Sequence, residues 1–281
     1  VFTAQERKEW EPVIKEFEER TGWNVRVETG SAKEMLSQLE KEEADWDVAF
    51  GVSADALEEG KEYWQTGKDA WTGYSAVSFV ILYNTNVVTY RELPTGWDSL
   101  LEPRWKGRVA VPDPLKSDMA ASVLTEAAKN SEKEEFLDLL AENMQYQMPE
   151  TFKEVEQGIS DGRYSIGVTS EEAAKAMLAA GQDVDYIDPE EGECFFEDGT
   201  AIRKRTPNLD ASEAFVTYTT CDDTKWLLRT QLLRQPAEDV AAENDRSDED
   251  LKQRYSRQQE VLNIWKLIME EKSGSAHEQE Q

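Results

Sequence analysis

The clearest pattern in the sequence is Asp47-Val48-Ala49-Phe50-Gly51-Val52-Ser53-Ala54, which predicts a short apolar strand, a glycine turn, and a serine that caps the following helix. The same order occurs elsewhere in the chain. A helix is expected from residue 6, a strand over 24–28, and a second helix from Ser31, where a capping box begins. Strands that alternate with helices imply parallel pairing and right-handed crossovers, so the sequence predicts an α/β layer fold.

A long apolar run at 76–84 dominates the next part of the chain. Its nearly continuous hydrophobicity is typical of a central strand that is buried on both faces. Further strands are expected at 108–112, 146–148, 164–168, 183–187 and 199–203. Further helices are expected at 97–101, 118–128, 132–143 and 171–180. The region from 209 to 272 is expected to be mostly helical.

The composition limits the possible partners. The 281 residues include 59 acidic and 31 basic side chains, a net charge of −28. Binding to DNA, RNA or anionic membranes depends on basic side chains, so this charge argues against all three. With 39% hydrophobic residues and nine each of Trp, Tyr and Phe, the chain is expected to be globular. No segment has the roughly 20 apolar residues of a membrane helix, and no signal segment is recognisable at the N-terminus.

The only histidine, His277, lies in a polar C-terminal segment. A Ser-His-Asp triad, a Cys-His pair and a histidine-rich zinc site are therefore excluded from the body of the chain. The sequence also contains no phosphate-binding P-loop and no dinucleotide-binding glycine motif. Carboxylates alone could still serve a glycosidase or a hard-cation site, but with 59 of them in the chain a pair is uninformative. Cys194 and Cys221 leave open whether they form a disulfide or two buried thiols.

A hydroxyl residue recurs where a strand gives way to a helix. The five examples are Ser31, Ser53, Ser117, Thr151 and Ser170. Each alone is explained by helix capping. In an open α/β sheet, however, ligands bind at the carboxyl ends of the strands, where helix N-termini present unpaired N–H groups that can hold a phosphate. The five together favour a site for an anionic headgroup.

The segment Trp97-Asp98-Ser99-Leu100-Leu101-Glu102-Pro103-Arg104-Trp105-Lys106-Gly107-Arg108-Val109-Ala110-Val111-Pro112-Asp113-Pro114 resembles the central signature of extracellular solute-binding proteins of ABC importers. The resemblance is to the branch that contains ferric-iron, aminoethylphosphonate and sugar-phosphate binders. Weaker matches follow in order at 51–57, 83–85, 166–169 and 207–215, so that the resemblance covers about residues 1 to 235.

This resemblance implies a periplasmic-binding-protein fold of the second type, with two Rossmann-like α/β lobes joined by two hinge strands near 76–84 and 188–203. Lobe 1 would comprise 1–77 and 196–281, and lobe 2 would comprise 78–195. The implied function is capture of a small solute in the cleft between the lobes, outside the cytoplasmic membrane, and delivery to an ABC permease. The resemblance therefore also implies no enzyme activity, no cofactor and no metal site. The protein would be extracytoplasmic and monomeric.

The resemblance also assigns ligand contacts to particular residues. Lobe 1 would contribute Ser31 and Ser53, the hinge Ser75, and lobe 2 Ser117, Asp118, Thr151, Thr169, Ser170 and Glu172. Glu172 matches an acidic position of the family and would favour a solute that carries its own cation, which makes aminoethylphosphonate the leading candidate and hexose or glycerate phosphates the next. Alternatively, Glu171 and Glu172 only complement the helix dipole.

Two other functions follow from the same resemblance. Iron binders of this branch present adjacent tyrosines near the helix that here begins Ser170-Glu171-Glu172, often with a histidine from the first lobe. This chain has neither a tyrosine pair there nor a histidine in its body, which disfavours ferric iron. A second alternative is the extracellular sensor domain of a membrane histidine kinase, in which the helix at 250–271 would continue into a membrane segment.

Overall fold

The computed structural model describes the whole chain except residues 6, 66–69, 242–246 and 280–281, and omits the side chains of 7–9, 240, 241, 248 and 273–279. The chain forms two compact units. Unit 1 consists of Val1–Val77 and Phe196–Ser256, and unit 2 of Ser78–Phe195 and Arg257–Gln281.

Unit 1 contains a mixed sheet. Strand β1 (Phe2–Thr3) pairs in parallel with β2 (Glu28–Thr29) and with β3 (Val48–Ser53). Strand β8 (Cys194–Ile202) pairs antiparallel with β3, and β9 (Gln235–Pro236) pairs antiparallel with the first half of β4. The expectation of purely parallel strands is therefore wrong, because the chain re-enters this sheet along β8 in the opposite direction.

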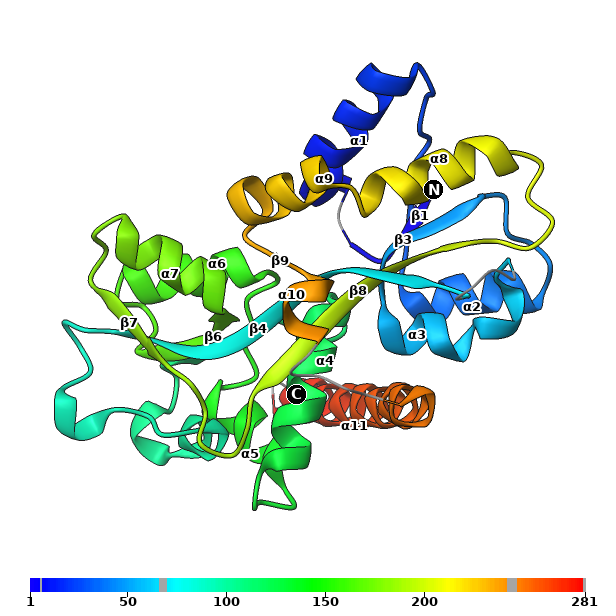
Figure 1. Ribbon diagram of the computed structural model, residues 1–281. Coiled ribbons are helices and arrows are strands. Elements are labelled where there is room, and N and C mark those ends of the chain that lie inside the picture. Colours follow the sequence, from blue (N-terminus) through cyan, green and yellow to red (C-terminus); the bar gives the residue numbers. More distant parts are fainter. Residues whose placement is uncertain (6, 66–69, 242–246, 280–281) are drawn as a thin grey trace. The chain divides into compact units, whose positions relative to one another are not determined.

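Helices cover both faces of the unit 1 sheet (Figure 1). One face carries α1 (Arg7–Thr21), α8 (Leu209–Thr219) and α9 (Asp222–Leu227), and the other carries α2 (Ala32–Glu40) and α3 (Ala54–Glu59). Trp10 of α1 packs edge-on against Phe50 of β3 at 4.9 Å between ring centroids. Both rings are buried, so this contact fixes α1 onto the sheet.

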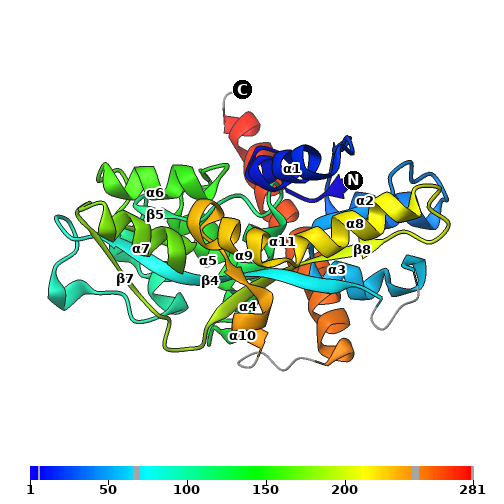
Figure 2. The same ribbon diagram turned by 45° about the horizontal axis from the view of Figure 1, so that its top comes forward.

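Unit 2 is built around the second half of β4 (Thr72–Asn84), which is almost entirely buried. Strands β6 (Ile166–Ser170) and β7 (Val184–Ile187) pair antiparallel with β4, and β5 (Val109–Ala110) pairs in parallel with β6. Helices α6 (Phe152–Ser160) and α7 (Glu171–Ala179) cover one face, and α4 (Asp118–Asn130) and α5 (Phe136–Asn143) lie on the other (Figures 1 and 2). The remaining helices are the short turns Lys61–Tyr63, Tyr90–Glu92, Trp97–Leu101 and Pro103–Trp105, a π-helix at Leu228–Leu232, α10 (Ala237–Ala241) and α11 (Asp248–Gln279).

The tryptophan-rich signature has a structural role in unit 2. The indole of Trp97 is fully buried, and its Nε1 donates to the carbonyl of Gly192 at 3.0 Å. The carboxylate of Glu191 accepts from the backbone N–H groups of Trp97 and Asp98 at 2.9 and 3.0 Å, and so caps the turn that begins there. This segment thereby anchors the loop before β8.

One expectation about local structure is wrong. Residues 146–148 do not form a strand, because Gln145 and Tyr146 adopt left-handed backbone conformations with φ of 55° and 57° that end α5. The chain passes between the units a third time within α11, where residues 257–281 group with unit 2. Burial of Val261 and Trp265 and a 3.2 Å hydrogen bond from Gln258 to the carbonyl of Asp118 explain this grouping.

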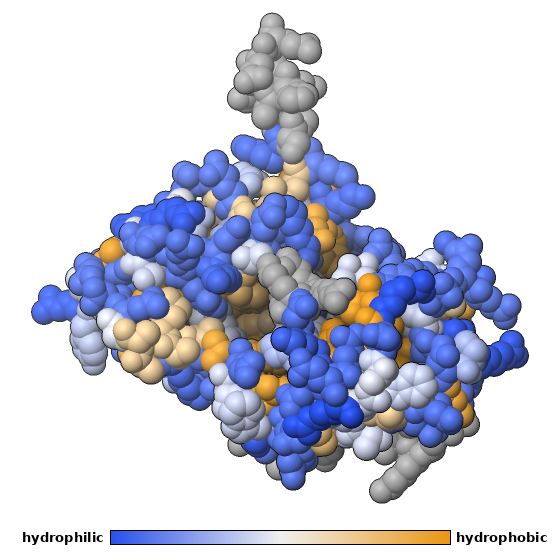
Figure 3. Space-filling view, turned by 90° about the horizontal axis from the view of Figure 1, so that it is seen from above, coloured by the Kyte–Doolittle hydropathy of each residue, from blue (hydrophilic) through white to orange (hydrophobic). Residues whose placement is uncertain are grey.

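Hydrophilic residues dominate the face shown in Figure 3, where hydrophobic residues form scattered patches. Among the residues that the structure describes, no helix combines the length and the hydrophobicity needed to cross a membrane. Cys194 and Cys221 are both free thiols, which resolves the alternative left open by the sequence.

Gly167 provides a test of the packing in unit 2. A Cβ at this position would lie 2.5 Å from the carbonyl oxygen of Ala110 and 2.9 Å from Val155, both in the core of the unit. We expect Gly167→Ala to lower the free energy of unfolding by about 3 kcal/mol, because neither the paired strand nor the helix can move away.

The control is Gly181→Ala, where φ is +74° but no atom lies within 4 Å of the added Cβ. It is expected to cost about 1 kcal/mol through backbone strain alone. Equal losses for the two variants in urea denaturation would contradict the packing described for β5, β6 and α6.

Candidate functional site

All five expected hydroxyl residues cap helices. Each side-chain oxygen accepts a hydrogen bond from the backbone N–H three residues later, at 3.2 or 3.3 Å: Ser31 on α2, Ser53 on α3, Ser117 on α4, Thr151 on α6 and Ser170 on α7. Capping uses the oxygen as an acceptor only. The hydroxyl hydrogen therefore decides whether a residue can still donate to a solute.

Three of the expected contact residues already donate within the protein. Ser31 donates to the carboxylate of Glu34 at 3.1 Å, which completes the capping box. Ser75 donates to Asp198 at 2.9 Å, and Thr169 donates to Glu156 at 2.6 Å. Among the described residues, the hydroxyl hydrogens of four others make no hydrogen bond: Ser53, Ser117, Thr151 and Ser170.

Unit 2 brings the N-termini of α4 and α6 together. The loop before α4 contacts the loop before α6 through a 2.9 Å hydrogen bond from the N–H of Asp113 to the carbonyl of Pro149. An ion pair between Lys116 and Glu150 joins the same loops. The two helices therefore begin at neighbouring points on one edge of the unit 2 sheet.

The N-terminus of α7 lies at the same edge. Phe152, the first residue of α6, stacks on Phe79 of β4 with the ring centroids 5.5 Å apart. Phe79 is in turn the strand partner of Ser170, the capping residue of α7. Three capped helix N-termini thus gather where β5 and β6 end, and their partial positive charges add at this edge.

The structure gives Glu172 a partner within its own helix. Its carboxylate lies 3.0 Å from Nζ of Lys175, and the carboxylate of Glu171 lies 2.9 Å from the same nitrogen. These two contacts raise the pKa of Lys175, against the opposing effect of its burial. This pairing agrees with the simpler interpretation of the two glutamates, and a contact between Glu172 and a solute stays a prediction.

Asp118 and Thr169 occupy different surroundings in unit 2. Asp118 is the first residue of α4, and its backbone carbonyl accepts from Gln258. Thr169 is fully buried beside Glu156, and burial raises the pKa of that carboxyl group above its usual value. The hydroxyl of Thr169 is therefore committed to Glu156.

In unit 1, Ser53 lies beside a buried polar cluster. Ser53 is the strand partner of Asp198 on β8. Asp198 is fully buried and forms an ion pair with Arg234, which is 7% exposed. Arg234 also donates to Gln5 at 2.7 Å and to Ser75 at 3.3 Å, so the cluster joins the end of β1 to β4, β8 and the start of β9.

The backbone before Arg234 places this side chain in the cluster. The π-helix at Leu228–Leu232 is followed by Leu233 in a left-handed conformation with φ of 52°, and the N–H of Arg234 bonds to the carbonyl of Leu228 at 3.0 Å. The guanidinium then lies 4.8 Å from the ring centroid of Trp10. Sequence analysis did not find Gln5, Asp198 or Arg234, because Arg234 is 159 residues from Ser75 and 229 from Gln5.

A second buried ion pair lies nearby. Arg254 donates through Nε to Asp55 at 3.0 Å, and both side chains are nearly inaccessible to solvent. Glu197 sits close to this pair and packs against Gly73, where an added Cβ would collide with it. Burial, reinforced by Asp55, raises the pKa of Glu197 to about 7.

Within the part of the chain that the structure describes, no three His, Cys, Asp or Glu side chains are grouped as metal ligands would be. What the two units offer is hydroxyl and backbone donors at helix N-termini and two paired guanidinium groups. Such donors can bind an anion or a polar solute without covalent chemistry.

The two α/β units and the β4 and β8 strands that the units share form the type II periplasmic-binding-protein fold. The chain belongs to a family of bacterial extracellular solute-binding proteins, whose model matches residues 50–259. The members of this family and the structural neighbours are binding proteins and not enzymes. The family implies an extracytoplasmic location.

Comparisons with known proteins support the same class. The chain is 23% identical to the iron uptake protein A1 of Synechocystis over 82% of its own length and 69% of the relative. It is similar to the periplasmic binding protein AfuA from Actinobacillus pleuropneumoniae with bound fructose-6-phosphate, with a TM-score of 0.77, 14% identity, and coverage of 96% and 97% of the two chains. It is also similar to a ferric binding protein from Campylobacter jejuni, with a TM-score of 0.76, 16% identity, and coverage of 95% and 98%.

The raised pKa of Glu197 predicts how stability depends on pH. A carboxyl group with a pKa near 7 in the folded protein and near 4.5 in the unfolded chain binds more protons when folded. Its contribution to stability is therefore complete below about pH 4.5 and is lost as the pH rises to about 7. We expect Glu197→Gln to raise the free energy of unfolding at pH 8 by about 1 to 3 kcal/mol relative to its effect at pH 4.5.

Urea denaturation at both pH values measures this difference. The exposed Glu62→Gln variant is the control and should show no such dependence. If Glu197→Gln and Glu62→Gln behave alike, the carboxyl group of Glu197 is not held in its protonated form.

Proposed function

We propose that this protein captures a small organic solute that carries a phosphate or phosphonate group and delivers it to an ABC permease. The family match over residues 50–259 carries the general part of this proposal, because proteins of this family bind solutes outside the cytoplasmic membrane. The nature of the solute is argued from the chain itself.

The gathered N-termini of α4, α6 and α7 support an anionic headgroup. Ser117, Thr151 and Ser170 each combine a free hydroxyl hydrogen with the backbone N–H groups of a first helical turn. A phosphate or phosphonate has three oxygen acceptors, and neutral donors of this kind bind it without requiring a spare cation. The bound fructose-6-phosphate named for the neighbour AfuA supports the same solute class by analogy.

Ferric iron is the alternative that the names of two similar proteins favour. Against it, Ser170, Glu171 and Glu172 stand at the start of α7 where tyrosines are expected in an iron binder, and both glutamates pair with Lys175. Phenolate ligands are therefore missing from this position. A sensor domain of a membrane kinase, a solute trapped between closing lobes, and a monomeric state stay predictions from the sequence.

Alanine variants of the capping residues test the anionic headgroup. We expect Ser117→Ala and Ser53→Ala to weaken the binding of fructose-6-phosphate or 2-aminoethylphosphonate about ten- to a hundredfold, because each removes a hydrogen bond to a charged group. Isothermal titration calorimetry measures this change directly.

Thr89→Ala is the matched control. Thr89 caps a short turn in unit 2 but already donates to Glu92 at 2.6 Å, so its loss should lower stability without changing affinity. Parental affinity in both serine variants would place the headgroup elsewhere.

The role of Glu172 is tested by its own substitution. If its carboxylate contacts the amine of a solute, Glu172→Gln should weaken 2-aminoethylphosphonate at least about tenfold while ethylphosphonate is little affected. Glu171→Gln is the control, because it removes the other carboxylate paired with Lys175. Equal effects of Glu172→Gln on both compounds would show that no amine is recognised there.

A further inference from the structure

Unit 1 contains a hollow at the end of its sheet opposite to Ser53. The hollow has a volume of about 390 Å³, which is sufficient for a small organic molecule. It is lined by Asp47 and Val48 at the start of β3, by Arg203 just after β8, by the 23–26 segment before β2, and by α8. Because Ser53 is at the other end of β3, this hollow is separate from the proposed headgroup site.

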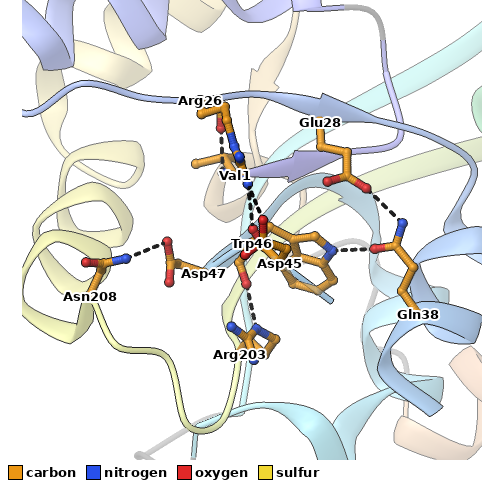
Figure 4. Close-up of polar contacts among 9 residues, drawn as sticks. All are labelled: Val1, Arg26, Glu28, Gln38, Asp45, Trp46, Asp47, Arg203 and Asn208. Carbon is orange, nitrogen blue, oxygen red and sulfur yellow. Dashed lines mark hydrogen bonds and ion pairs between the residues drawn. The ribbon is translucent and has the colours of Figure 1, made fainter. Parts of the chain in front are cut away.

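The charged side chains that line the hollow differ in how many hydrogen-bond and ion-pair partners they have (Figure 4). Arg26 pairs with Asp45 at 2.8 Å, and Asp47 accepts from Thr206 at 2.5 Å and from Asn208 at 3.1 Å. The carboxylates of Asp45 and Asp47 therefore already have hydrogen-bond donors within the protein.

Arg203 differs from these residues. Its Nε donates to the carbonyl of Trp46 at 2.5 Å, which fixes the plane of the guanidinium. Its two terminal nitrogens have no hydrogen-bond or ion-pair partner among the residues that the structure describes. The side chain is half-buried, so this fixed pair of donors faces a partly desolvated space.

Aromatic side chains form another part of the lining. Phe17 and Phe215 meet edge to face at 5.0 Å beneath the hollow, and the indole of Trp23 at its border is 50% exposed. An exposed tryptophan beside a hollow offers a flat apolar surface that a ligand ring can cover.

We propose that this hollow is a second binding site, and that it takes a small organic acid with a flat apolar body. The carboxylate bonds to the terminal nitrogens of Arg203, and the apolar body lies against Trp23. A carboxylate fits better than a phosphate dianion, because Asp45 and Asp47 line the same space and repel the additional charge.

The probe for this site is 3-phenylpropionate, compared with its neutral isostere 3-phenylpropanamide at about 0.15 M salt. In the parent protein we expect saturable shifts of the Trp23 indole N–H resonance in NMR, assigned with Trp23→Phe. Affinities of the parent and of every variant are measured by isothermal titration calorimetry, and the affinity of the parent for the acid should be at least about tenfold higher than for the amide. Arg203→Gln should remove the difference between the two compounds, whereas Trp23→Ala should weaken both.

Controls separate this site from the proposed function and from misfolding. Trp226→Ala removes another exposed tryptophan of unit 1 and should leave binding of the probe unchanged, as should Ser53→Ala. Because Nε of Arg203 has a structural bond, its variant is accompanied by Trp23→Ala, whose side chain is exposed. No saturable shift at the solubility limit of the acid, equal affinity for acid and amide, or parental affinity in Trp23→Ala would each overturn the proposal.

Discussion

The cations that lie beside Ser53, Ser117 and Ser170 are already paired with carboxylates, and this constraint shapes the proposed headgroup site. Arg234 pairs with Asp198 and Arg254 with Asp55 in unit 1, while in unit 2 Lys116 and Lys175 pair with glutamates. The contacts proposed for the headgroup are therefore backbone N–H groups and hydroxyls. These donors lie at helix N-termini, and two of the helices, α4 and α7, follow the strands β5 and β6, so the fold determines where the donors gather.

The buried pair of Arg234 and Asp198 holds the strand ends of unit 1 in place. It connects β8 to Gln5 after β1 and to Ser75 on β4, and Ser53 lies directly opposite Asp198. The removal of two charges from water costs much of the free energy that their attraction provides. Such a pair therefore contributes more to the placement of the strands than to the stability of the fold. The removal of one partner would leave the other as an uncompensated buried charge.

The features that the sequence predicts well are local. The caps at Ser31, Ser53, Ser117, Thr151 and Ser170 involve atoms only three residues apart, so the pattern of residues suffices to identify them. The resemblance in the segment from Trp97 to Pro114 likewise led to the correct family and fold class.

The features that the sequence did not reveal depend on topology. Arg234 reaches Asp198 only because a π-helix and a left-handed Leu233 turn the chain back toward the sheet. The antiparallel entry of β8 cannot be read from hydrophobic periodicity, which is the same in either direction. Hydroxyl groups that already donate a hydrogen bond within the protein also cannot be recognised from the sequence. Ser75 and Thr169 look like the other hydroxyl residues until the structure shows Asp198 and Glu156 beside them.

Elemental analysis of the loaded protein tests the central claim most directly. The protein is equilibrated with a bacterial metabolite extract supplemented with ferric citrate, desalted, and analysed for phosphorus and iron by mass spectrometry in the same sample. If the protein holds an organic phosphate or phosphonate through neutral donors, the sample should contain about one phosphorus atom per chain and little iron. Iron at about one atom per chain, with or without phosphorus, would contradict the account.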